Sequence, residues 1–248
     1  PDMKSDGWKV NQIYEDSRGL IWVATPNGLK VLDRTRGKVL KLKLNDSDQQ
    51  KYILGIIQDN GGSMWVSAGQ ELLNLKVVYN EKSGDLSVLT HVYDNRDGLM
   101  DCDFNQRSFA KLPSGEIVVG GFYGLNRFLP SEIKLNTVRP KVIFTDLTMG
   151  SEKVRPGNKI DGRVVLTTGL NQGGTVEFSD SPKEFSVYFS TDNYVLPEKT
   201  VYEYKLEGYN EEWMKCPQGV NHVTYTNLSP GKYRLLVRAI NSDGYESE

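Results

Sequence analysis

The sequence predicts an all-β chain: a partial β-propeller of about three blades, followed by an immunoglobulin- or fibronectin-III-like β-sandwich. Two observations lead to this prediction. A turn-and-tryptophan motif recurs in the first half at the length of one propeller blade. Segments of the second half alternate apolar and polar side chains, which is typical of half-buried antiparallel strands. We place the boundary at Arg139-Pro140, so that residues 1–138 form the propeller part and residues 139–248 the sandwich.

The propeller motif is clearest in two copies. Residues 13–23 read IYEDSRGLIWV, and residues 56–66 read IIQDNGGSMWV. Trp22 and Trp65 are 43 residues apart, and the Asp and Gly of the motif keep the same offset. The Asp is expected to accept backbone N–H bonds inside a tight turn, and the Gly to supply a positive φ. Each tryptophan is expected to be buried between neighbouring blades.

A third, weaker copy follows at residues 109–121, FAKLPSGEIVVGG, in which Val118 takes the place of the tryptophan. The spacing from Trp65 to Val118 is 53 residues, so an insertion is expected, and residues 93–99 are its expected place. Three copies do not close a ring, because propellers have typically four to eight blades. The sequence therefore predicts a fragment of a propeller or an incomplete one.

The second half reads as a sandwich of about seven strand segments in about 110 residues. Alternation is clear in residues 185–190, 202–206 and 233–239. Tyr233 follows a turn and starts a late strand, which predicts a tyrosine corner whose hydroxyl bonds back to upstream backbone. Trp213 is expected in the core.

The formal net charge is −2 and no basic stripe is present, so nucleic acid is not an expected partner. The apolar runs are far too short to span a membrane. Cys102 and Cys216 have no metal-ligand spacing around them, and we expect two unrelated thiols, with an interdomain disulfide as the alternative. His91 and His222 are expected on strand surfaces. No metal or cofactor is predicted.

Catalysis is not predicted. A sialidase-type Asp box needs Asp and Gly two positions apart, and here they are three apart. Asp101, Asp103 and Glu116 are the carboxylate candidates for glycoside hydrolysis, which needs two convergent carboxylates. Acidic residues on turns are mostly solvated or capping, and neither histidine belongs to a nucleophile–base–acid set.

Binding of a sugar uses different chemistry, because an aromatic ring covers the apolar face of a sugar while amide and guanidinium groups satisfy its hydroxyls. The candidates are Asn105, Gln106 and Arg107 together with Phe122 and Tyr123, at equivalent ends of one hairpin. In the alternative interpretation Phe122 and Tyr123 merely pack in a turn, and Arg107 pairs with a nearby acid.

The D-x-x-G-x-x-W-V pattern with a following Gly28-Leu29 resembles the two-component regulator propeller repeat. Residues 97–130 are similar to the final propeller segment of that family, and residues 202–233 resemble the Tyr-rich Y_Y_Y domain that follows it. The resemblance implies the periplasmic sensor region of a hybrid two-component system. Its expected properties are an inner-membrane anchor through a helix outside this chain, a cytoplasmic histidine kinase, an oligosaccharide ligand, and signalling through a dimer with adjacent Y_Y_Y domains.

The chain departs from that pattern because most blades are missing, the third copy lacks its tryptophan, and the last Y_Y_Y strand is expected to run past Glu248. An open blade face and unpaired sheet edges favour self-association. The alternative function is a secreted propeller-type carbohydrate-active enzyme, or its accessory or adhesion module. The sequence does not name the glycan.

Overall fold

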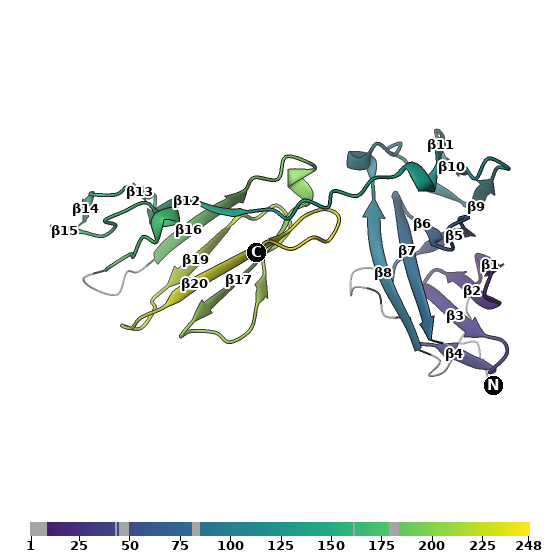
Figure 1. Cartoon of the computed structure of the whole chain (residues 1–248), viewed down its shortest axis with the longest axis horizontal. Helices are drawn as coiled ribbons and strands as arrows, with labels where there is room; N and C mark the ends of the chain where they lie inside the picture. Colours follow the sequence, from purple (N-terminus) through teal and green to yellow (C-terminus); the bar gives the residue numbers. More distant parts are fainter. Residues whose placement is uncertain (1–8, 43, 45–49, 81–84, 161, 179–183) are drawn as a thin grey trace. The chain divides into compact units, whose positions relative to one another are not determined.

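The computed structural model describes residues 9–42, 44, 50–80, 85–160, 162–178 and 184–248 (Figure 1). Strands dominate these residues, and the fold class is all-β, as predicted. The chain divides into two compact units, Pro1–Lys134 and Leu135–Glu248, whereas the sequence placed the boundary between residues 138 and 139.

The described residues of the first unit form three antiparallel sheets, each a blade whose strands follow chain order. The first blade consists of β1 (Gln12–Glu15), β2 (Leu20–Thr25), β3 (Gly28–Asp33) and β4 (Lys38–Leu40). The second consists of β5 (Ile53–Gln58), β6 (Met64–Ala68), β7 (Glu71–Asn80) and β8 (Asp85–Tyr93). The described part of the third contains β9 (Phe104–Lys111), β10 (Ile117–Gly121) and β11 (Gly124–Phe128).

The tryptophans of the motif are buried between blades, as predicted. Trp22 is 0% exposed and belongs to the apolar cluster that joins the first two blades. Trp65 is 3% exposed and packs with Ile117 and Phe128 of the third blade. Gly55 lets the ring of Phe109 approach, because a Cβ there would lie 2.9 Å from that ring. The first two blades therefore each pack a tryptophan against the next blade, and Phe109 of the third blade packs against the second.

The Asp of the motif holds both the turn and the tryptophan. In the first blade, Asp16 Oδ1 accepts the backbone N–H groups of Arg18 at 2.9 Å and Leu20 at 3.0 Å. Its Oδ2 accepts the indole N–H of Trp22 at 2.9 Å. Asp16 is 4% exposed, so these bonds satisfy a carboxylate that lies away from water.

The second blade repeats this arrangement. Asp59 Oδ1 accepts the backbone N–H of Ser63 at 2.9 Å, and its Oδ2 accepts the indole N–H of Trp65 at 2.9 Å. Gly62 has a φ of 84°, which is the left-handed conformation predicted for this position.

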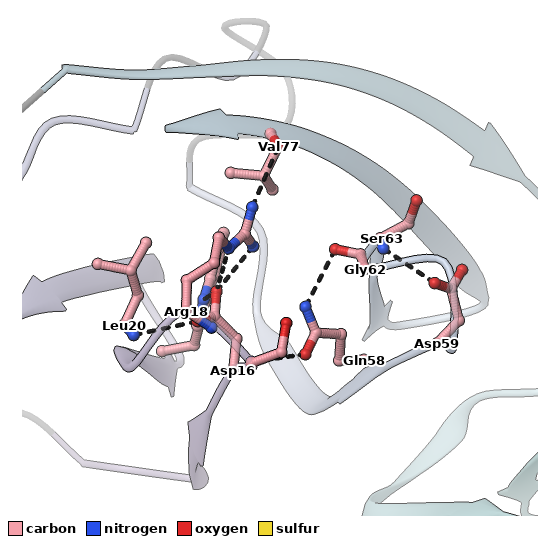
Figure 2. A network of polar contacts seen from close by, with 10 residues as sticks. Asp16, Arg18, Leu20, Gln58, Asp59, Gly62, Ser63 and Val77 are labelled. Carbon is pink, nitrogen blue, oxygen red and sulfur yellow. Dashed lines mark hydrogen bonds and ion pairs between the residues drawn. The ribbon is translucent and has the colours of Figure 1, made fainter. Parts of the chain in front are cut away.

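The two turns are also tied to each other, as Figure 2 shows. Gln58 Oε1 accepts the backbone N–H of Ser17 at 2.8 Å, and its Nε2 donates to the carbonyl of Gly62 at 3.1 Å. Arg18 donates to the carbonyl of Val77 at 3.1 Å. These bonds fix the first blade against the second at this end of the strands.

The prediction that the added residues of the second repeat lie at 93–99 is wrong. The extra residues lie in the β7–β8 hairpin, where β7 has 10 residues and β8 has 9, against 6 in β3 and 3 in β4. Both strands are longer than their counterparts in the first blade, because β8 pairs with β7 from Asn80↔Asp85 to Leu72↔Tyr93. The segment after β8 instead forms a short 3-10 helix, η1 (Asn95–Asp97). A second one, η2 (Pro130–Glu132), follows the third blade.

The second unit is a sandwich of two described sheets and a short hairpin. One sheet has the order β13-β12-β16-β19, the other has the order β18-β17-β20, and the hairpin is β14–β15. The strands are β12 (Val142–Met149), β13 (Glu152–Val154), β14 (Lys159–Ile160), β15 (Arg163–Val164), β16 (Glu184–Thr191), β17 (Val201–Glu207), β18 (Met214–Lys215), β19 (His222–Thr226) and β20 (Arg234–Ile240). Two 3-10 helices, η3 (Leu170–Gln172) and η4 (Pro197–Lys199), lie in the connections.

Tyrosines contribute much of the sandwich core. Tyr202, Tyr204, Tyr225 and Tyr233 all pack in one cluster. The predicted tyrosine corner is confirmed, since the hydroxyl of Tyr233 donates to the carbonyl of Ser229 at 2.9 Å. Burial raises the pKa of the Tyr225 hydroxyl, with smaller contributions from neighbouring groups.

Two of the expectations for single residues, those for Trp213 and His91, are wrong. Trp213 is 38% exposed rather than in the core, and the Arg238 guanidinium lies 4.5 Å from its ring centroid. His91 is 6% exposed, so its expected place on a strand surface is also wrong. Cys102 and Cys216 are buried free thiols, one in each unit.

Candidate functional site

The antiparallel blades have two ends, which carry different loops. The end that we call the front rim carries the β2–β3, β6–β7 and β10–β11 turns, the start of β5 and the connection into β9. The end that we call the back rim carries the β1–β2 and β5–β6 turns, with Asp16 and Asp59. All five predicted site residues lie on the front rim.

A large β-bulge at the start of β9 contains Asn105, Gln106 and Arg107. Phe104 pairs with Gly121 and Phe109 pairs with Val119, so the four residues 105–108 lie opposite Gly120 alone. The Ser108 hydroxyl is 2.8 Å from the Gly120 carbonyl oxygen and 2.7 Å from that of Asn105, and it closes the bulge. Bulges re-aim side chains and are common beside binding sites.

The bulge gives Arg107 an unusual backbone. Its φ is 57°, a conformation that favours glycine and is uncommon for other residues. Arg107 Nε donates to the carbonyl of Asn11, just before β1, rather than to an acid. Gln106 Nε2 donates to the Tyr52 hydroxyl at 3.0 Å. All three predicted polar residues are exposed.

Phe122 and Tyr123 form the β10–β11 turn, where they are 68% and 84% exposed and do not pack inward. The backbone N–H of Phe122 donates to the carbonyl of Asp103 at 3.1 Å, which fixes the turn beside the start of β9. The register of β9 and β10 therefore brings the aromatic turn and the polar bulge to the same rim.

The sequence did not reveal a polar hollow of about 440 Å³ on the front rim. It is lined by Ala68, Gln70, Glu71, Asp94, Asn95, Arg96 and Asp101. Asp94 shapes it by capping η1, because its side chain accepts the backbone N–H of Arg96 at 2.9 Å. The spacing of Asp94 and Asp97 is that of a capping box, which is the one local signal that marks this loop in the sequence.

One of the three carboxylate candidates for catalysis, Glu116, lies away from the other two. Asp101 and Asp103 lie in the loop that leads into β9 at the front rim, whereas Glu116 lies at the far end of β10, where Arg127 pairs with it at 3.3 Å. Among the described residues, no group of three or more His, Cys, Asp or Glu side chains is arranged to hold a metal ion. None of the helices in the described residues is long and apolar enough to cross a membrane.

Two family models match the chain, in the predicted order. The two component regulator propeller model matches residues 5–27, and the Y_Y_Y domain model matches residues 193–248. The chain thus contains a two-component regulator propeller repeat and a Y_Y_Y domain, and the resemblance drawn from its sequence is confirmed.

Two relatives extend this comparison. Histidine kinase P4 of Formosa agariphila is 25% identical over 193 residues, which cover 78% of this chain and 13% of that protein. A crystal structure of the extracellular domain of the putative hybrid two component system BT3049 from B. thetaiotaomicron superposes with a TM-score of 0.66. It is 24% identical, and the match covers 97% of this chain and 31% of the other. The chain therefore shares the fold of that domain and spans less than a third of its length.

Proposed function

We propose that this chain is the ligand-sensing part of a hybrid two-component sensor histidine kinase, and that it binds an oligosaccharide on the front rim. The order of the propeller repeat and the Y_Y_Y domain supports the sensor assignment, together with the relatives named above. In this proposal the chain lies in the periplasm, and the Y_Y_Y domain passes the signal to a membrane helix outside this chain.

The observation that carries the ligand assignment is the exposed Phe122–Tyr123 turn beside the bulge. Two exposed aromatic rings offer apolar faces for a sugar ring, and the Asn105, Gln106 and Arg107 side chains offer donors and acceptors for its hydroxyls. The hollow next to η1 extends the polar surface along the rim, so that the site suits a chain of several sugars.

Binding to a broad panel of oligosaccharides, measured by calorimetry, tests the proposal. The Phe122→Ala and Arg107→Ala variants are expected to weaken binding of any ligand that the panel reveals. Tyr194→Ala is the matched control, because Tyr194 is 89% exposed in the other unit. Binding that is indifferent to both front-rim changes contradicts the site, and cleavage of the glycan by the chain contradicts the sensor assignment.

We also propose that the chain self-associates through the outer face of the first blade. The motif offset makes Ile13 equivalent to Ile56, yet Ile13 is 63% exposed and Ile56 is 0% exposed. Val39, on the same blade, is 49% exposed. The first blade thus exposes apolar side chains on a face whose equivalent in the second blade is buried. Such an exposed apolar face favours a two-fold pair in which each copy covers the other.

A further inference from the structure

The first residues of the second unit are held by side-chain hydrogen bonds and not by a sheet. Residues 135–139, the lead-in segment, form no strand, and Val138 is 71% exposed. Little apolar burial therefore fixes this segment. Its fixed position depends on polar contacts, and most of these come from the turn that follows β20.

Asn241, at the start of that turn, is 3% exposed and uses its whole amide. Its Nδ2 donates to the carbonyl of Asn136 at 2.8 Å and to that of Val138 at 3.0 Å. Its Oδ1 accepts the backbone N–H groups of Asp243 at 3.0 Å and Tyr245 at 2.9 Å. One side chain thus bonds to the lead-in segment with its donors and to the turn with its acceptor.

Two further bonds strengthen the same junction. Asp243 Oδ2 accepts the backbone N–H of Asn136 at 2.8 Å. Asn136 Nδ2 donates to Asn193 Oδ1 at 3.1 Å, and Asn193 in turn bonds to Thr200 at 3.2 Å. The lead-in segment is therefore also tied to the connection between β16 and β17.

The turn continues into residues 243–247, the return segment, which folds back along β20. The Ser247 N–H donates to the carbonyl of Ala239 at 2.8 Å, and Arg238 pairs with Glu246 at 2.7 Å. The first and last residues of the unit are thus held on either side of one buried amide.

We propose that the Asn241 side chain couples the lead-in segment to the return segment, so that a displacement of one is passed directly to the other without repacking of the sandwich core. This coupling does not depend on the ligand proposed above. Rigid, fully bonded polar networks are suited to such a role, because breaking one member leaves buried groups unpaired.

Hydrogen exchange of the whole chain, read by mass spectrometry or NMR, tests the coupling with Asn241→Asp. The carboxylate keeps the acceptor for Asp243 and Tyr245 but loses both donors to the lead-in carbonyls. We expect the amides of Asn136 and Val138, and also those of Asp243, Tyr245 and Ser247, to exchange on the order of tenfold faster, the equivalent of one unpaired buried group. Faster exchange in the lead-in segment alone would overturn the proposal.

Asn171→Asp is the control for loss of an amide donor, at an exposed position. Asn171 Oδ1 accepts the Phe144 N–H at 2.8 Å and its Nδ2 donates to the Phe144 carbonyl at 2.7 Å, so the substitution has the same chemistry away from the junction. It is expected to leave hydrogen exchange in both segments unchanged.

If Asn241→Asp raises exchange throughout β12 and β16, Asp243→Ala is the deciding variant instead, because it removes the carboxylate that accepts the Asn136 N–H. Joint loosening of both segments supports the coupling, and loosening of one alone overturns it.

Discussion

The Asp16 carboxylate accepts the indole N–H of Trp22 at 2.9 Å, and Asp59 and Trp65 repeat this bond at the same distance. The third copy of the repeat has Leu112 at the Asp position and Val118 at the Trp position. Both partners are thus absent together. Replacement of the Asp alone would leave the buried indole N–H without its acceptor. Asp16 without its tryptophan would still be paired with the Arg18 guanidinium at 2.7 Å and with two backbone N–H groups.

Loss of either tryptophan should open a cavity between blades. We expect Trp22→Ala and Trp65→Ala each to lower the free energy of unfolding by about 3–5 kcal/mol, the usual cost for a large buried aromatic. Denaturant unfolding of the first unit measures this. A loss below about 1 kcal/mol at both sites would show that the interblade packing is wrong.

The backbone of Arg107 should limit stability. Glycine adopts a φ of 57° without steric cost, whereas alanine adopts it only at a steric cost. Both substitutions remove the same bond to Asn11, so Arg107→Gly should be more stable than Arg107→Ala by about 1 kcal/mol. Thermal unfolding of the two variants makes the comparison, and equal stability would argue against a strained bulge.

Asp33 should make the first unit sensitive to acid. The Tyr79 hydroxyl, with the Arg36 backbone N–H and guanidinium, lowers the pKa of Asp33 to about 2. Because the folded-state pKa lies below the unfolded value of about 3.9, the stabilisation is fully present above pH ~4 and is lost as pH falls through about 2. Tyr79→Phe should therefore be less stable than the wild type at neutral pH, with a difference that shrinks toward pH 2. A difference that is constant with pH would contradict this account.

Self-association should depend on the outer face of the first blade. Ile13→Glu places a charge on that face, while Val78→Glu, at a 70% exposed position of the β7–β8 hairpin, serves as the control. Light scattering over a range of concentrations should show that only Ile13→Glu gives a monomer. A wild-type chain that is monomeric throughout would disprove the pairing.

Local patterns predicted the parts of the fold that local chemistry determines. Asp16, Gly19 and Trp22 lie within seven residues, and their turn forms as the spacing indicates. Trp213, just before β18, is instead 38% exposed, and its ring contacts the Arg238 guanidinium of β20. No short-range pattern reports such a contact.

The candidate site shows the same division. The front-rim position of Arg107 and Phe122 follows from one hairpin and was predicted. The hollow was not, because it brings Gln70 of the β6–β7 turn to Asp94 and Asp101 of a later loop. The added residues of the second repeat lengthen the paired strands β7 and β8. The spacing of a motif does not show whether added residues extend strands or a loop.

The central claim is that a sugar ligand binds the front rim, and hydrogen exchange with and without a bound oligosaccharide tests it most directly. We expect slower exchange in residues 105–108 and 122–124 when the ligand is present, with no change in the back-rim turns that contain Gly19 and Gly62. Protection confined to the back rim or to the Y_Y_Y domain, with the bulge and the aromatic turn unchanged, would contradict the account.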